Sequence, residues 1–97
     1  MDASGSGPAS DLIFTALANP TRRAIFERLY RGGEQRMGTL KEGLGVSRQQ
    51  ALKHLGVLQL AGLVTCRRVG SPRHLYYSAS PPGAMPLLDW FAKHGIL

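Results

Sequence analysis

The chain has 97 residues, a net charge of +6 and one cysteine. This length corresponds to a single domain with a small core, and its apolar runs are too short to span a bilayer. Cys66 has no partner for an internal disulfide, and the N-terminus lacks the charged and apolar regions of a signal peptide. We therefore exclude a membrane or secreted disulfide-rich protein and expect a cytoplasmic one.

The first elements are predicted to be a tail and a short helix. Residues 1–9 are rich in Ser, Gly and Ala, so we expect a disordered tail before a domain at 10–97. Ser10 or Asp11 can cap a helix that ends near Ala18. Its apolar side chains indicate burial on more than one side, in the core or against a second subunit. They are Leu12, Ile13, Ala16 and Leu17.

A second helix follows at once. Asn19 is a suitable N-cap and Pro20 suits the first helical position. The helix is predicted to run to about Arg31, with an apolar stripe that includes Ile25 and Leu29, and to end at the two following glycines. Residues 34–37 are expected to form a loop.

The segment 39–64 has the pattern of a helix-turn-helix. Leu40 and Leu44 are four residues apart, so they are predicted to share one face of a short helix that Gly45 ends. Ser47 has the chemistry of an N-cap for a second helix, 47–61. Two helices joined by a short turn that contains glycine are typical of this motif.

The second motif helix has two different faces. Ala51, Leu55 and Leu58 fall on one side and are predicted to face the core. Gln49 and Lys53 fall on the opposite side, with Leu52 at its edge and Gly56 beside them. Amide and cationic groups read base edges in the major groove, and a small residue permits close approach. The alternative is an ordinary solvated helix face.

The positive charge is concentrated in one part of the chain. Between Arg36 and His74 there are seven lysines and arginines and a single acid, Glu42. The five remaining basic residues balance the five remaining acids, so this span contains the entire net charge. Such a distribution indicates a partner that is a polyanion.

After the motif, Val64–Val69 and His74–Ser80 are predicted strands, joined by a turn at 70–73. The resulting hairpin 64–80 has Arg67 and Arg68 on its first strand and Arg73 at its tip. Arginines on such a wing commonly contact phosphates or the minor groove. A solvated, charged sheet edge is the alternative.

The last predicted helix covers about residues 85–94 and is apolar nearly all round. That much apolar surface is expected to be covered, either by the domain core or by a second subunit. The residues concerned are Leu87, Leu88, Trp90 and Phe91.

Three stretches together resemble the ArsR-type winged-helix regulators of bacteria: ALANPTRRAIFERL, LGVSRQQALKHLGVLQLAGLV and RRVGSPRHLYYS. The resemblance covers about residues 12–91. It implies a mainly α fold with a small β-hairpin (α+β), and a dimeric repressor, associated with the nucleoid, that binds a palindromic double-stranded DNA operator. It implies pairing of subunits through the first and last helices. The residues expected at the DNA are Ser47, Arg48, Gln49, Gln50, Leu52, Lys53, His54, Arg67, Arg68 and Arg73. Those expected at the dimer interface are Leu12, Ile13, Ala16, Leu87, Leu88, Trp90 and Phe91.

Some features depart from the family pattern. Lys41 and Ala51 stand where alanine and valine are usual, and Leu52 stands where a serine often faces DNA. The cysteine pair of metal-sensing members is missing, and Asp89 and His94 are too few ligands for a closed metal site. We expect no metal, no cofactor and no enzyme activity. An RNA-binding or protein-interaction module is the alternative function, and Cys66 is either a small strand residue or a reactive thiol.

Overall fold

The computed structural model describes residues 8–71, 74–80 and 93, with side chains from residue 12 onward. The mainly α fold with a small β-hairpin is confirmed. The predicted helix 85–94 lies outside the described residues apart from Lys93, and so does Arg73 of the predicted turn. The helices and strands are α1 (Pro8–Ala18), α2 (Pro20–Gly32), β1 (Gln35–Arg36), α3 (Met37–Leu40), α4 (Arg48–Leu60), β2 (Val64–Val69) and β3 (His74–Ala79).

The junction between α1 and α2 is held by side chains from the start of α2. Asn19 caps α2 as predicted, because its Oδ1 accepts hydrogen bonds from the backbone N–H groups of Thr21 (2.9 Å) and Arg22 (3.1 Å). Arg22 donates to the carbonyls of residues 15 and 16, and Arg23 to those of residues 17 and 18. The two guanidinium groups thereby satisfy carbonyls that the last turn of α1 leaves without helical partners. α1 begins at Pro8, so Pro8 and Ala9, predicted as part of the tail, belong to a helix; residues 1–7 lie outside the described residues.

One core joins the helices to the sheet. The predicted inward face of α4 is confirmed, because Ala51, Leu55 and Leu58 are all buried. α1, α2 and α3 supply the other helical residues, and Leu63, the first residue of β2 and the middle of β3 complete the core. The remaining buried side chains are Ala16, Leu17, Ile25, Phe26, Leu29, Met37, Leu40, Leu63, Val64 and Tyr77.

The first motif helix differs from the prediction. α3 has only four residues, Met37–Leu40, so Leu44 lies in the turn and not on the helix. Gly43 and Gly45 both have positive φ, 76° and 70°, and two such residues within three positions bend the backbone before the helix can continue. Leu44 and Val46 still pack against the core from the turn. Arg28 closes the end of α3 by donating to the carbonyls of Leu40 and Glu42.

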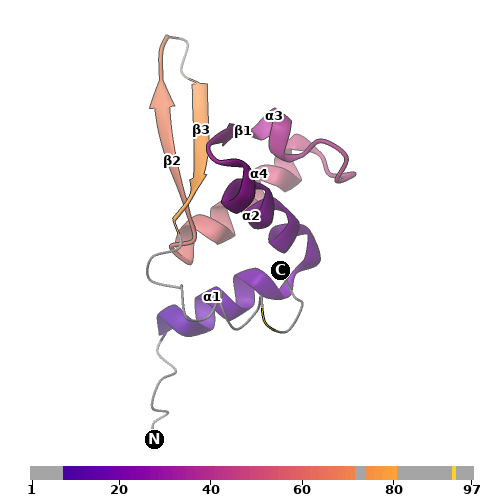
Figure 1. Ribbon diagram of the computed structural model, residues 1–97, viewed down its shortest axis with the longest axis vertical. Coiled ribbons are helices and arrows are strands. Elements are labelled where there is room, and N and C mark those ends of the chain that lie inside the picture. The colour runs from indigo at the N-terminus through magenta and orange to yellow at the C-terminus, as the bar shows by residue number, and fades with distance from the viewer. Residues whose placement is uncertain (1–7, 72–73, 81–92, 94–97) are drawn as a thin grey trace, which may run out of the picture.

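The sheet has three strands in the order β1-β3-β2, all antiparallel neighbours. The loop predicted for 34–37 is therefore wrong: Gln35 and Arg36 pair with Tyr77 and Tyr76 of β3. A two-residue strand is too short to show alternation in the sequence. In Figure 1 the β2–β3 hairpin extends away from the helices, at the opposite end of the molecule from α1. Among the described residues, no helix is long and apolar enough to cross a membrane.

Candidate nucleic-acid interface

The start of α4 is fixed by a reciprocal cap. The Ser47 hydroxyl accepts a hydrogen bond from the Gln50 backbone N–H (3.1 Å), and the Gln50 side-chain oxygen accepts from the Ser47 N–H (2.9 Å). This capping box confirms Ser47 as the N-cap and sets the direction in which α4 begins. It also engages the Gln50 amide oxygen, so of the two neighbouring amides only Gln49 has both polar atoms available to a partner.

The outer face of α4 is open to solvent. Arg48, Gln49 and Lys53 are exposed, and Leu52 remains 39% exposed at the edge of this face. An amide, two cations and a short apolar patch are thereby presented together on one rigid helix. These groups match what base edges, phosphates and thymine methyls offer in a major groove.

His54 does not lie on this open face. It is partly buried, and its Nδ1 is 3.4 Å from Nη1 of Arg22. Burial lowers the pKa of the His54 imidazole, and the charges of Arg22 and Lys53 lower it further. His54 therefore connects α4 to the α1–α2 junction.

The three arginines predicted on the wing have different environments. Arg67 forms a bidentate ion pair with Glu34 (2.6 and 2.7 Å), and its guanidinium also lies 5.2 Å from the centre of the Tyr76 ring. The hydrogen bond from Arg67 is the main reason that the pKa of the Glu34 carboxyl is lowered. Arg68 is exposed and has no such partner among the described residues, and Arg73 lies outside them.

The basic residues between Arg22 and Arg68 fall into two groups. Those of α2 and Arg67 are engaged: Arg22, Arg23 and Arg28 donate to carbonyls, and Arg31 pairs with Glu27. Within the described part of the chain, a second group has neither a carboxylate nor a carbonyl partner, and it belongs to α4 and the elements beside it. This group consists of Arg36, Lys41, Arg48, Lys53 and Arg68. Cations that no carboxylate or carbonyl of the protein engages are suited to bind an external polyanion.

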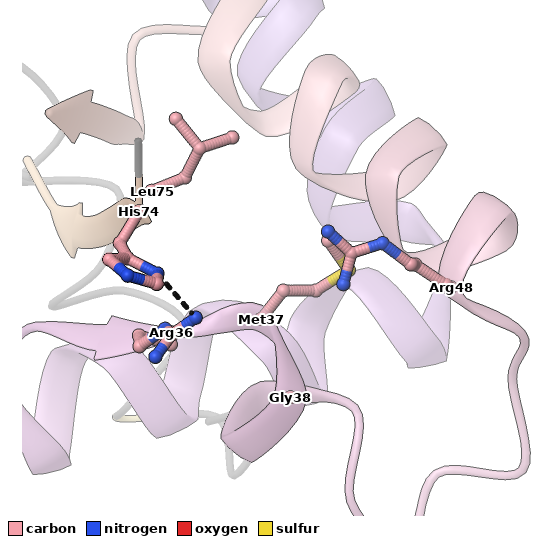
Figure 2. Close-up of a pocket in the computed structure, with 6 residues that line it drawn as sticks. All are labelled: Arg36, Met37, Gly38, Arg48, His74 and Leu75. Atoms are coloured by element: carbon pink, nitrogen blue, oxygen red, sulfur yellow. Dashed lines mark hydrogen bonds between the residues drawn. The ribbon is translucent and has the colours of Figure 1, made fainter. Parts of the chain in front are cut away.

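A small hollow lies between the start of α4 and the sheet (Figure 2). Arg48 extends into it from α4, while Arg36 and His74 meet on the sheet side, where Nη2 of Arg36 is 2.9 Å from Nδ1 of His74. The sequence prediction did not include Arg36 or His74. Arg36 stood in a segment predicted as a loop, and its partner is 38 residues away, so no local pattern indicated the contact.

The proposed interface residues of α1 are only partly available. Leu12 is 47% exposed and Ile13 is partly buried, whereas Ala16 is 0% exposed within the single chain. Ala16 therefore belongs to the core and has no surface to offer a second subunit. The other predicted interface residues lie outside the described residues.

No cluster suited to a metal ion, with three or more His, Cys, Asp or Glu side chains, occurs among the described residues. Cys66 is partly buried on β2 and has no disulfide partner; its thiol lies 4.0 Å from the Arg67 carbonyl oxygen.

Comparison with known proteins places this geometry in a family. A model described as a helix-turn-helix domain matches residues 17–67. The chain is 40% identical over 77 residues to the uncharacterized HTH-type transcriptional regulator YuzN of Bacillus subtilis, with 73% of this chain and 84% of YuzN covered. It is 30% identical to the transcriptional repressor SdpR of the same organism, with 80% of this chain and 83% of SdpR covered.

Solved structures agree with this assignment. An ArsR-like transcriptional regulator from Rhodococcus sp. RHA1 has a TM-score of 0.68 and 33% identity, over 88% of this chain and 77% of that one. The residues matched by the helix-turn-helix model include α3, α4 and the first part of β2. The chain belongs to the ArsR-type winged helix-turn-helix transcriptional regulators, which bind DNA.

Proposed function

We propose that this protein is a dimeric repressor that inserts α4 into the major groove of a palindromic operator and places the β2–β3 wing on the flanking backbone. The observation that supports this proposal is the group of cations on α4 and beside it that have no carboxylate or carbonyl partner, whereas the described arginines of α2 and Arg67 are paired. SdpR, a relative of similar length, is named as a transcriptional repressor. The operator is in the cytoplasm, and we place the protein there.

The DNA-contacting residues have two roles in this proposal. Gln49 and Leu52 contact base edges, since they are exposed on α4 and uncharged. The cations Arg48, Lys53 and Arg68 bind phosphates, as does Arg73 at the tip of the wing. Ser47 and Gln50 fix the start of α4 through their reciprocal cap. His54 joins α4 to the α1–α2 junction through Arg22.

A two-fold dimer would place two copies of α4 in successive major grooves. Half-site centres are then expected about one helical turn apart, or a multiple of it. We propose that subunits pair through α1, where Leu12 and Ile13 remain accessible, together with Leu87, Leu88, Trp90 and Phe91.

The test compares a base-reading residue with a phosphate-binding one. DNA fragments that copurify with the protein are sequenced to define the operator. Binding to this operator and to a scrambled duplex is then measured over a series of salt concentrations for the unmodified protein, Gln49→Ala and Arg68→Ala. Gln49→Ala should cost operator binding about 1–3 kcal/mol and leave scrambled DNA nearly unchanged.

Arg68→Ala should weaken binding to both duplexes and reduce the slope of log affinity against log salt by about one for each phosphate that the variant no longer binds. Opposite behaviour of the two variants would reverse the roles that we assign to α4 and the wing. A protein that prefers structured RNA of equal length over its best duplex would contradict the proposal as a whole.

A further inference from the structure

The hollow between α4 and the sheet has the composition of an anion site. It encloses about 150 Å³ and is lined by Arg36, Met37, Gly38, Arg48, His74 and Leu75, without a carboxylate. Pockets for drug-sized ligands are larger, about 300–1,000 Å³. Its size therefore suits a compact group such as a phosphate better than an organic effector.

The sheet side of the hollow is held in place by a hydrogen bond between side chains. A guanidinium group can only donate, so Arg36 donates to Nδ1 of His74, and the neutral ring must carry its proton on Nε2. The pairing of β1 with β3 sets Arg36 opposite Tyr76, two residues from His74. Because both residues belong to the sheet, the Arg36 guanidinium is positioned before any ligand arrives.

On the α4 side, the hollow is lined by Arg48, the first residue of that helix. Arg48 is exposed and has no carboxylate or carbonyl partner in the described structure. Figure 2 shows its guanidinium directed toward the space that Arg36 and His74 border. Its charge also reaches Tyr77 of β3: burial raises the pKa of that phenol, and Arg48 opposes the rise.

The same two arginines border a second hollow, with Gly38, Thr39 and Glu42. The Glu42 carboxylate lines only that second hollow, so a negatively charged group is favoured in the first. Two guanidinium groups facing one space repel each other unless an anion lies between them. Arginine is also the side chain best matched to bind phosphate oxygens through two parallel N–H donors.

We propose that this hollow binds one phosphodiester of the DNA backbone, held by Arg36 and Arg48, with His74 positioning Arg36. This inference rests on the proposed function, since the hollow lies where α4 meets the wing and would join their two contacts with DNA. It adds Arg36, from a strand that is not part of the helix-turn-helix or the hairpin, to the residues that touch the operator.

The first test uses two variants that remove the same charge. Arg36→Ala and Arg31→Ala each remove one positive charge, but Arg31 lies on α2 and pairs with Glu27. Arg36→Ala should reduce the salt slope by about 0.9 per subunit, whereas Arg31→Ala should leave it unchanged. Affinity for operator and scrambled DNA should fall by the same factor, because a phosphate contact carries no sequence information. Equal slopes for both variants would overturn the proposal.

The second test locates the phosphate. Operator duplexes with a single neutral methylphosphonate at successive positions are bound by the unmodified protein, Arg36→Ala and Arg36→Lys. At one position per half-site, neutralisation should weaken the unmodified protein and Arg36→Lys clearly more than Arg36→Ala, in which only Arg48 still faces that phosphate. Melting temperatures establish that the variants are folded. If Arg36→Ala stays as sensitive as the unmodified protein at every position, Arg36 does not bind a phosphate.

A third measurement separates DNA from a free anion. Inorganic phosphate is titrated into the protein without DNA while the His74 ring signals are followed by NMR. We expect no saturation below millimolar phosphate. Tight binding of free phosphate that also releases DNA would overturn the DNA assignment. If instead the unmodified protein does not discriminate its operator at all, it is the proposed function that fails.

Discussion

At the scale of single residues, Asn19 caps the start of α2 with its side chain. Its Oδ1 accepts two backbone hydrogen bonds at the start of α2, directly after the last residue of α1. Asn19→Ala removes both and should lower the free energy of unfolding by about 1 kcal/mol. For a domain of this size that corresponds to a fall in melting temperature of about 4–8 °C. Asn19→Asp keeps the acceptor and should melt within about 2 °C of the unmodified protein; equal destabilisation in both variants would show that the cap is not the cause.

His54 makes stability depend on pH. The pKa of His54 in the folded protein is lowered by burial first, and then by Arg22 and Lys53. Around the ordinary imidazole pKa of about 6.5, the His54 side chain therefore binds a proton more readily in the unfolded chain than in the folded protein. Unfolding becomes easier as pH falls through that value, because the unfolded state binds more protons than the folded one.

The corresponding experiment is thermal unfolding at pH about 7.5 and about 5.5, on either side of the ordinary imidazole pKa. The unmodified protein should lose more stability between the two values than His54→Gln, which cannot titrate. His74→Gln serves as a matched control, since it removes a different histidine. A pH dependence that persists in full in His54→Gln would assign it to another group.

At the scale of elements, the wing is joined to the segment before β1 by Arg67, a cation that could also bind DNA. Glu34 binds Arg67 through both carboxylate oxygens and also accepts from the Ser78 hydroxyl (3.3 Å). The pair is exposed, so its contribution to stability is expected to be at most about 1 kcal/mol. Its effect on DNA binding should be larger, because Glu34 competes with phosphate for Arg67.

Glu34→Gln should therefore raise DNA affinity and steepen the salt slope by about 0.9 per subunit, as Arg67 becomes available to a phosphate. Glu27→Gln is the control, since it also removes one acid paired with an arginine, but on α2. Filter binding over a salt series measures both variants. If affinity rises equally in the two variants, the effect is one of net charge and Arg67 does not reach DNA.

The elements also show what local sequence patterns can predict. α2, α4 and both strands of the hairpin have clear periodicity or caps, and their bounds were predicted to within one residue. β1 and α3 were not, because β1 forms only through pairing with β3 and α3 is cut short by the turn at Gly43. The same distinction between local and long-range features applies to the candidate site. The outer face of α4 follows from helical spacing, whereas the contacts of Arg36 with His74 and of Arg22 with His54 join residues 38 and 32 positions apart.

At the scale of the whole molecule, the arrangement of charge and apolar surface favours a dimer. The cations without a carboxylate or carbonyl partner between Arg36 and Arg68 belong to α4 and the elements beside it. α1 lies at the other end of the molecule from the wing (Figure 1), and its Leu12 is half exposed. A single copy would bind one half-site, with only its own phosphate contacts. The proposed pairing through α1 would double these contacts and leave both α4 helices free to enter the groove.

Leu12→Glu should therefore shift the protein toward monomers, because it places a charge in the apolar surface between subunits. Operator binding should weaken and its salt slope should fall to about half, since a monomer binds only half as many phosphates as the dimer. Val69→Glu is the control for assembly, because Val69 is also a partly exposed apolar residue but lies on the wing. Sedimentation velocity at micromolar concentration measures the assembly state of each. A monomeric unmodified protein, or a Leu12→Glu variant as dimeric as Val69→Glu, would show that α1 is not the interface.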